Sequence, residues 1–185
     1  MDEVLAEPAP NPKLTGLTGA YLYATAAAFA AKARVDDAKA RFAELEKVSA
    51  LDGEAGLNRV KDVLAVAVLN ARARIALAEN KGDEAVGLLR EAVAEEDRLA
   101  YSEPADWFFP TRHLLGAVLI EAGQAKDAEV VYRDDLGRHP NNGWALYGLA
   151  QSLKLQDRLA DAVEAQQRFD KVWKNADVAV SASAF

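Results

Sequence analysis

The chain has 185 residues, enough for one hydrophobic core, and its 51% apolar content is dominated by alanine. With 22 Lys and Arg against 29 Asp and Glu the net charge is -7 and no basic block occurs, which argues against a nucleic-acid partner. The absence of cysteine excludes disulfides, thiolate metal sites and cysteine nucleophiles. No apolar run is long enough to span a membrane, so we expect no membrane contact. The alanine content predicts an all-α protein, and the lack of cysteine fits a cytoplasmic one.

The first residues, 1–13, are acidic and proline-rich, which predicts a flexible lead-in and not a secretory signal. Residues 14–175 are predicted to form one helical-repeat domain. Its helices are expected as four antiparallel pairs, at 14–33 with 36–48, 55–79 with 83–100, 111–122 with 126–138, and 143–155 with 159–174. The small and polar residues of 176–185 predict a frayed tail.

Each second helix is expected to begin close to an aspartate, whose carboxylate caps free N–H groups and meets the positive end of the helix dipole. These aspartates are Asp36, Asp83, Asp127 and Asp161. The first two pairs carry insertions relative to a 34-residue unit, one around 49–58 and one that includes EPADWFFPTRH, residues 103–113. Because large aromatic side chains are costly to leave in water, we predict that Trp107, Phe108 and Phe109 form an inter-repeat wedge with at least two of them buried.

The last third of the chain repeats with a period of 34 residues, since residues 109–140 align with 143–174. Small residues recur at 116, 128, 150 and 162, and they allow the two helices of a pair to approach closely. Large apolar residues lie between them and fill the grooves. This pattern predicts helix pairs stacked along the chain.

Residues 109–140 resemble a tetratricopeptide repeat. Leu115 and Gly116 match the family's first-helix leucine and small residue, Gly123 its turn glycine, Ala128 its second-helix alanine, Tyr132 the following aromatic residue and Pro140 its closing proline. The copy at 143–174 has Gln166 and Lys174 at the last two positions. The resemblance implies a right-handed α-solenoid of about four antiparallel helix pairs, with a concave face lined by the first helices. The acidic and aromatic EPxDW element also resembles the C-terminal part of longer bacterial proteins of this superfamily.

In that register a polar and aromatic set lines the concave face. Its members are Tyr23, Asn70, Arg74, His113, Trp144, Tyr147, Gln151 and Lys154. Side chains of these types suit an extended peptide or a partner helix. Only Asn70, Arg74 and Lys154 resemble the clamp with which peptide-binding members hold a terminal carboxylate, and they do not fall at its successive positions. The sequence therefore predicts a non-catalytic scaffold with a protein or peptide partner. Packing of Trp144 and Tyr147 on the preceding pair is the structural alternative.

Two other functions stay open. The chain could be a structural or oligomerisation module that stacks on itself as a homo-oligomer. It could also be a small-molecule-binding or enzymatic domain centred on His113 and the Trp107 region. No metal-ligand spacing, nucleophile elbow or phosphate loop occurs, so we expect no metal, no cofactor and no catalytic residue. The carboxylate pair Asp134 and Asp135 is expected on a solvated helix face.

Overall fold

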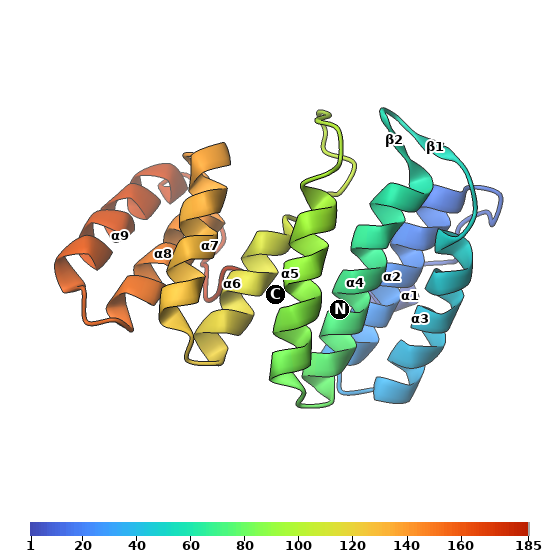
Figure 1. Ribbon diagram of the computed structural model, residues 1–185, viewed down its shortest axis with the longest axis horizontal. Helices are drawn as coiled ribbons and strands as arrows, with labels where there is room; N and C mark the ends of the chain where they lie inside the picture. The colour runs from blue at the N-terminus through green and yellow to red at the C-terminus, as the bar shows by residue number, and fades with distance from the viewer. Residues whose placement is uncertain (185) are drawn as a thin grey trace. The chain divides into compact units, whose positions relative to one another are not determined.

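Helices make up nearly all of the regular structure, as the alanine-rich sequence predicts. The computed structural model describes residues 1–184, and within this range it contains nine α-helices and one short β-hairpin (Figure 1). The elements are α1 (Asp2–Ala6), α2 (Thr15–Ala31), α3 (Val35–Ser49), β1 (Glu54–Ala55), β2 (Asn58–Arg59), α4 (Val60–Ala78), α5 (Gly82–Glu96), α6 (Thr111–Glu121), α7 (Ala125–Arg138), α8 (Gly143–Lys154) and α9 (Leu159–Trp173). The all-α fold class is therefore confirmed.

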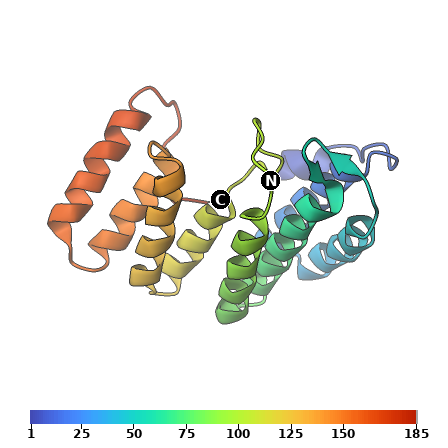
Figure 2. The same ribbon diagram turned by 45° about the horizontal axis from the view of Figure 1, so that its top comes forward.

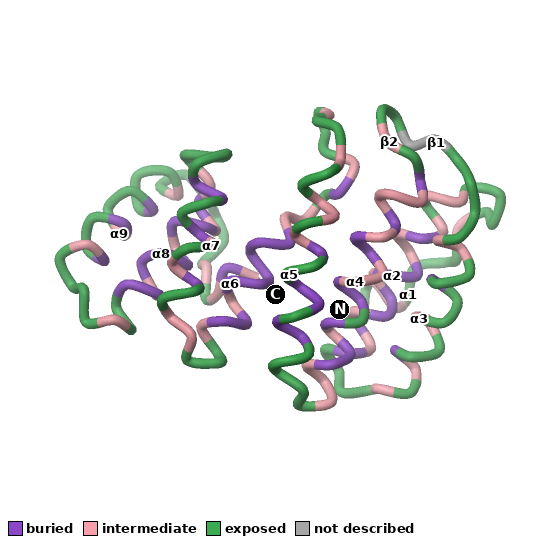
Figure 3. Tube along the Cα trace, in the orientation of Figure 1, coloured by how far each residue is buried: buried purple, intermediate pink, exposed green. Residues whose placement is uncertain are grey.

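The chain divides into two compact units, which we call unit 1 (1–108) and unit 2 (109 onward). In unit 1, α2 packs on α3 and on α4, and α4 packs on α5. In unit 2, α6 packs on α7 and on α8, and α8 packs on α9. Figure 3 shows that buried residues concentrate on the first helix of each pair, such as α4 and α8, whereas exposed residues are more frequent on the second helices.

The turn inside each pair has the same backbone geometry in all four pairs of the described chain. One residue adopts a positive φ, which is 55° at Ala33, 61° at Asn80, 72° at Gly123 and 57° at Asp157. The next residue donates its N–H to the carbonyl five residues earlier, as Arg34 does to Phe29 at 2.9 Å and Arg158 does to Leu153 at 3.1 Å. These bonds satisfy carbonyls that the end of the first helix leaves free. These four left-handed residues define a common register in which positions of the four helix pairs can be compared.

Two small buried residues flank every one of these turns, seven positions before the left-handed residue and five after it. They are Ala26 with Ala38, Ala73 with Ala85, Gly116 with Ala128, and Ala150 with Ala162. The small residues predicted at 116, 128, 150 and 162 are thus confirmed as buried, and the upstream pairs follow the same rule. Close helix contact at these points fixes the pairing.

Contacts between successive pairs also recur at matching positions. Lys39, six residues after its turn, donates to the carboxylate of Glu79, one residue before the next turn. In unit 2 the residues at those two positions are Glu129 and Gln156, and the amide of Gln156 donates to Glu129 at 2.9 Å. The second helix of one pair therefore meets the end of the next pair's first helix in the same way in both units.

Several predicted boundaries are corrected by the structure. The helix expected from residue 55 begins at Val60, because β1 and β2 form an antiparallel hairpin in front of it. The helix expected to reach residue 100 ends at Glu96. The lead-in contains the short helix α1, whose Asp2 pairs with Lys32 of unit 1 at 2.7 Å.

The aspartates expected to cap the second helices lie instead in the first turn. The cap positions hold Arg34, Lys81, Gln124 and Arg158, none of which makes a side-chain cap bond. The carboxylates still lie at the positive end of the helix dipole, so their effect is electrostatic. Arg158 uses its aspartate as a partner and donates to Asp161 from Nε at 2.8 Å, whereas Arg34 donates to the neighbouring Asp37 at 2.7 Å.

Candidate interaction surface

The structure places the eight predicted groove residues at very different depths. Tyr23, Asn70 and His113 are buried, Arg74, Trp144, Tyr147 and Gln151 are half-buried, and Lys154 is exposed. Asn70 donates to the carbonyl of Val66 at 2.9 Å, which is a bond within its own helix. The prediction that Tyr23, Asn70 and His113 face a ligand is therefore wrong, because their side chains fill the interior.

Four of the predicted groove residues occupy one register position, ten residues before the left-handed residue of their own turn. They are Tyr23, Asn70, His113 and Tyr147. At two of these positions a non-helical segment covers the helix. Trp107 lies on Tyr23 in unit 1, and the backbone of Ser181 accepts a hydrogen bond from Tyr147 in unit 2. The sequence did not show that parts of the chain itself cover this face.

The cover of unit 1 is an apolar side chain, that of Trp107. Trp107 is 5% exposed, and its ring meets the Tyr23 ring edge-on with centroids 5.0 Å apart, in a core built from α2, α3 and α4. Phe108 is 66% exposed, and Phe109 is half-buried in unit 2, where it meets His113 edge-on. The predicted three-residue wedge is therefore corrected to a single buried residue that packs within unit 1.

The two insertions of unit 1 are tied together by one asparagine. Asn58, in the hairpin, accepts from the N–H of Ala100 at 2.8 Å and donates to the carboxylate of Asp106 at 2.7 Å. Asp106 and the Trp107 and Phe108 rings line one side of a small apolar cavity of about 150 Å³ over α2 and α4. The hairpin therefore positions the loop that carries Trp107.

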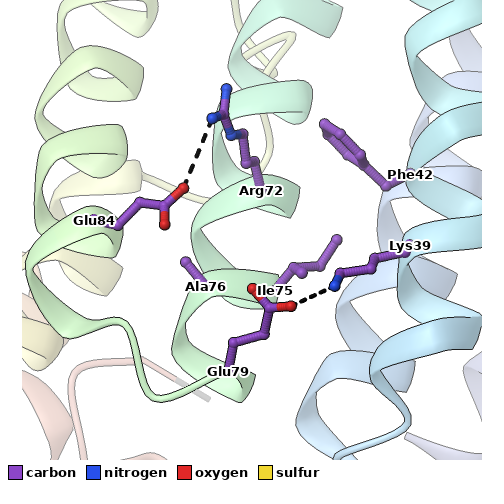
Figure 4. Close-up of a pocket in the computed structure, with 7 residues that line it drawn as sticks. All are labelled: Lys39, Phe42, Arg72, Ile75, Ala76, Glu79 and Glu84. Carbon is purple, nitrogen blue, oxygen red and sulfur yellow. Dashed lines mark hydrogen bonds and ion pairs between the residues drawn. The ribbon is translucent and has the colours of Figure 1, made fainter.

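A second cavity of unit 1, of about 230 Å³, lies between α3, α4 and α5 (Figure 4). Its two cations are both paired, Lys39 with Glu79 and Arg72 with Glu84 at 3.7 Å. Hydrogen bonds from Lys39 and Lys81 lower the pKa of Glu79 to about 2. The charges of this cavity balance one another, so it resembles a junction between helices more than an ion-binding site.

In unit 2, His113 is the centre of a buried polar network. Asn142 caps α8 through its Oδ1, which accepts from the N–H groups of Trp144 and Ala145, so its Nδ2 faces His113 Nε2 at 2.9 Å. Because an amide nitrogen donates, Nε2 is the acceptor of this bond. Asp135 lies 3.4 Å from Nε2. The ring is thus held by the cap of the next helix.

The carboxylate pair of α7 divides between the interior and the surface. Asp135 is buried, which corrects the expectation that both acids are solvated. Asp134 is half exposed and accepts from the buried Arg112 at 2.6 Å. Among residues 1–184 no cluster of three His, Asp or Glu side chains is placed to hold a metal ion.

The predicted aromatic residues of α8 face α9. Trp144 meets Trp173 edge-on at 5.3 Å between centroids, and Tyr147 meets Phe169 at 5.5 Å. Their packing is thus with the second helix of their own pair. Gln151 and Lys154 continue the same stripe of α8, at spacings of four and three residues, and Lys154 reaches solvent. This half-exposed stripe is what remains of the predicted groove in unit 2.

The tail expected to fray instead folds back over unit 2. Figure 2 shows the chain leaving the end of α9 and running back toward α6. Trp173 donates to the carbonyl of Val178 at 2.7 Å, and Ser183 is only 3% exposed. We call residues 176–184 the return segment. Phe185, the last residue of the predicted tail, lies outside the described residues.

Sequence reasoning missed two residues that hold these covers, Asn58 and Ser183, and two that surround His113, Asp135 and Asn142. The role of Asn142 as a helix cap could have been predicted, since asparagine is a preferred residue directly before a helix. Ser183 carries no such signal, because one serine in a run of small residues looks the same whether it is free or bound.

No protein-family model matches the chain, and no curated protein matches it. Within the part of the chain that the structure describes, no helix is both long and apolar enough to cross a membrane.

Proposed function

We propose that the chain is a tetratricopeptide-type repeat protein, stacked as a right-handed α-solenoid, and that it acts as a non-catalytic scaffold for a protein or peptide. The observation that carries this proposal is the recurrence of one turn at Ala33, Asn80, Gly123 and Asp157, with buried small residues at fixed offsets. Repeats of this kind leave the first helices as an extended surface suited to binding chains. The absence of cysteine supports a reducing compartment such as the cytoplasm.

The binding residues we assign are those that remain accessible. On α8 these are Gln151 and Lys154, next to the aromatic pair Trp144 and Tyr147. An amide, a cation and two aromatic rings supply hydrogen bonds and stacking with little loss of side-chain entropy. His113 supports an enzymatic function less well, because it is buried and its Nε2 is occupied by Asn142.

The test compares partner binding by the wild-type protein and by a double variant, Gln151→Ala with Lys154→Glu. Lys171→Glu is the matched control, since it makes the same charge change at an exposed position on α9. Proteins retained by each immobilised variant are identified, and one is then purified and titrated. We expect the double variant alone to lose at least tenfold in affinity. Equal affinity for all three proteins would refute binding through α8.

One observation favours the oligomerisation alternative. Leu155, Leu159 and Val163 follow one another at four-residue spacing, and they are 58%, 64% and 55% exposed. An exposed apolar stripe of this kind is suited to contact with a second copy. Sedimentation of the wild-type protein and of Leu159→Glu tests it: a concentration-dependent dimer that the variant abolishes would support the alternative, and two monomers would exclude it.

A further inference from the structure

The return segment is bound in unit 2 by three different helices. Tyr147 of α8 donates its hydroxyl to the carbonyl of Ser181 at 3.2 Å. Ser183 lies 2.5 Å from the hydroxyl of Tyr132 of α7, and it donates to the carbonyl of His113 of α6 at 3.0 Å. An irregular segment thus interacts with helix side chains and a helix terminus in the manner of a bound peptide.

The Ser183 position is narrow because of how Tyr132 reaches it. The Tyr132 ring crosses between two glycines, and a Cβ added to Gly116 of α6 or Gly148 of α8 would lie 2.3 Å or 2.2 Å from ring atom Cζ. Its hydroxyl emerges beside the Ser183 hydroxyl, where burial raises the pKa of the phenol. A small residue with a hydroxyl group fits this place.

The rest of the return segment is held loosely. Residues 176–179 and Ser181 are exposed, and Val178 and Ser181 are bound through backbone carbonyls. Contacts to the backbone do not depend on the side chain, so Ser183 is the position at which the site selects for a particular side chain. A segment with one fully buried residue and an otherwise exposed or half-buried remainder is suited to exchange with a similar one.

We infer that the surface of unit 2 that holds the return segment is a peptide-binding site, occupied in the resting protein by the chain's own residues 176–184. Its ligand is an extended segment with a small hydroxyl residue at the place of Ser183, and that ligand binds by displacing the return segment. This inference rests on the proposed scaffold function and adds its regulation, because the site is closed until the return segment leaves.

The first experiment releases the segment in the full chain. Ser183→Glu puts a long charged side chain at the buried position, whereas Ser181→Glu, the matched control, makes the same change at an exposed one. The probe is a fluorescent peptide of residues 176–184 with both ends blocked. If the resident segment is bound more than about 90% of the time, release raises the apparent affinity for the probe at least tenfold. We expect this rise for Ser183→Glu only, and no binding of a second probe that itself carries the Ser183→Glu change.

The second experiment leaves the native contacts in place, in case Ser183→Glu disturbs folding. Because the sequence has no cysteine, Ser181→Cys gives a single labelling site on an exposed residue of the return segment. Adding unlabelled 176–184 peptide is expected to lower the anisotropy of the label as the segment is displaced, and the same peptide with Ser183→Glu is expected to leave it unchanged. A constant anisotropy up to millimolar peptide would overturn the inference.

The two proposals fail separately. If the peptide does not bind but the α8 double variant still loses its partner, the scaffold function stands and the self-occupied site is wrong. If the peptide displaces the segment but no partner depends on α8, the site exists and the scaffold assignment through α8 is wrong.

Discussion

Unit 1 and unit 2 repeat one turn and one small-residue pattern, yet they cover their first helices by different chemistry. Trp107 covers Tyr23 by burying an indole in an apolar core, whereas the return segment covers α6 and α8 through hydrogen bonds of Ser183 and Ser181. Burying a large side chain stabilises by about 1.5–3 kcal/mol, and a hydrogen bond contributes about 0.5–1.5 kcal/mol net. The cover of unit 1 is therefore part of its core, and that of unit 2 can be exchanged.

The largest expected effect comes from removing the apolar cover. Trp107→Ala is expected to lower the free energy of unfolding by about 3–5 kcal/mol, because it leaves a cavity among α2, α3 and α4. Ser183→Ala is expected to cost about 1 kcal/mol, since it removes hydrogen bonds and little volume. Denaturant unfolding followed by circular dichroism measures both. Phe108→Ala, at a 66% exposed ring, is the control and is expected to change little. Equal losses from the Trp107 and Ser183 variants would contradict the distinction between covers.

A slightly smaller effect tests the glycines around Tyr132. Gly116→Ala is expected to destabilise unit 2 by about 2–3 kcal/mol, because the new methyl group would overlap a fully buried ring. Gly87→Ala is the matched control in unit 1. It lies in the middle of α5 with nothing within 4 Å of its added Cβ, so it is expected to stabilise by about 0.5–1 kcal/mol. Opposite signs in thermal unfolding bear out the prediction, and destabilisation by both would contradict it.

The shared turn can be tested by exchanging residues between the units. Ala33 bears the strain of a positive φ that Gly123 avoids. Ala33→Gly is therefore expected to stabilise unit 1 by up to about 1 kcal/mol, and Gly123→Ala to destabilise unit 2 by about 1 kcal/mol. Nothing lies within 4 Å of a Cβ added at Gly123, so packing does not interfere. Melting temperatures that move in the same direction for both variants would show that the two turns are not equivalent.

The sequence predicted the helix pairs well because their signals are local. A left-handed turn with small residues on both sides involves about a dozen neighbouring positions, and Gly116, Gly123 and Ala128 show the whole unit. The register derived from them also placed Tyr23 and Tyr147 on corresponding faces.

The burial of Trp107 followed from its size, but the contacts that hold the two covers could not be predicted, because each joins residues far apart in the chain. Asn58 meets Asp106 across 48 positions, and Ser183 meets His113 across 70. No periodic pattern records such contacts. The groove residues were predicted from the repeat register and from their polar or aromatic character, and neither distinguishes an accessible asparagine from Asn70, which bonds inside its helix.

The smallest expected effect distinguishes the contact between pairs in unit 1 from its counterpart in unit 2. Glu79 is bound by Lys39 and Lys81, and its pKa falls to about 2 from an ordinary 4.5, so the ionised form is favoured in the folded state. Its contribution to stability is therefore complete above about pH 4.5 and is lost as the pH falls toward 2. Glu79→Gln should lower the melting temperature slightly at pH 7 and progressively less toward pH 3, and high salt should shrink the difference because the pair lies near solvent. Glu91→Gln, at an exposed position on α5, removes the same charge without this contact and is expected to show no such pH dependence.

In unit 2, Glu129 receives an uncharged amide from Gln156 at the corresponding place, with Arg158 supplying the positive charge. Replacing Gln156 by Lys would place an ion pair at the same two positions with the charges exchanged between the helices, and a pH dependence at Glu129 that increases in this variant would show that the two positions can hold an ion pair in either direction.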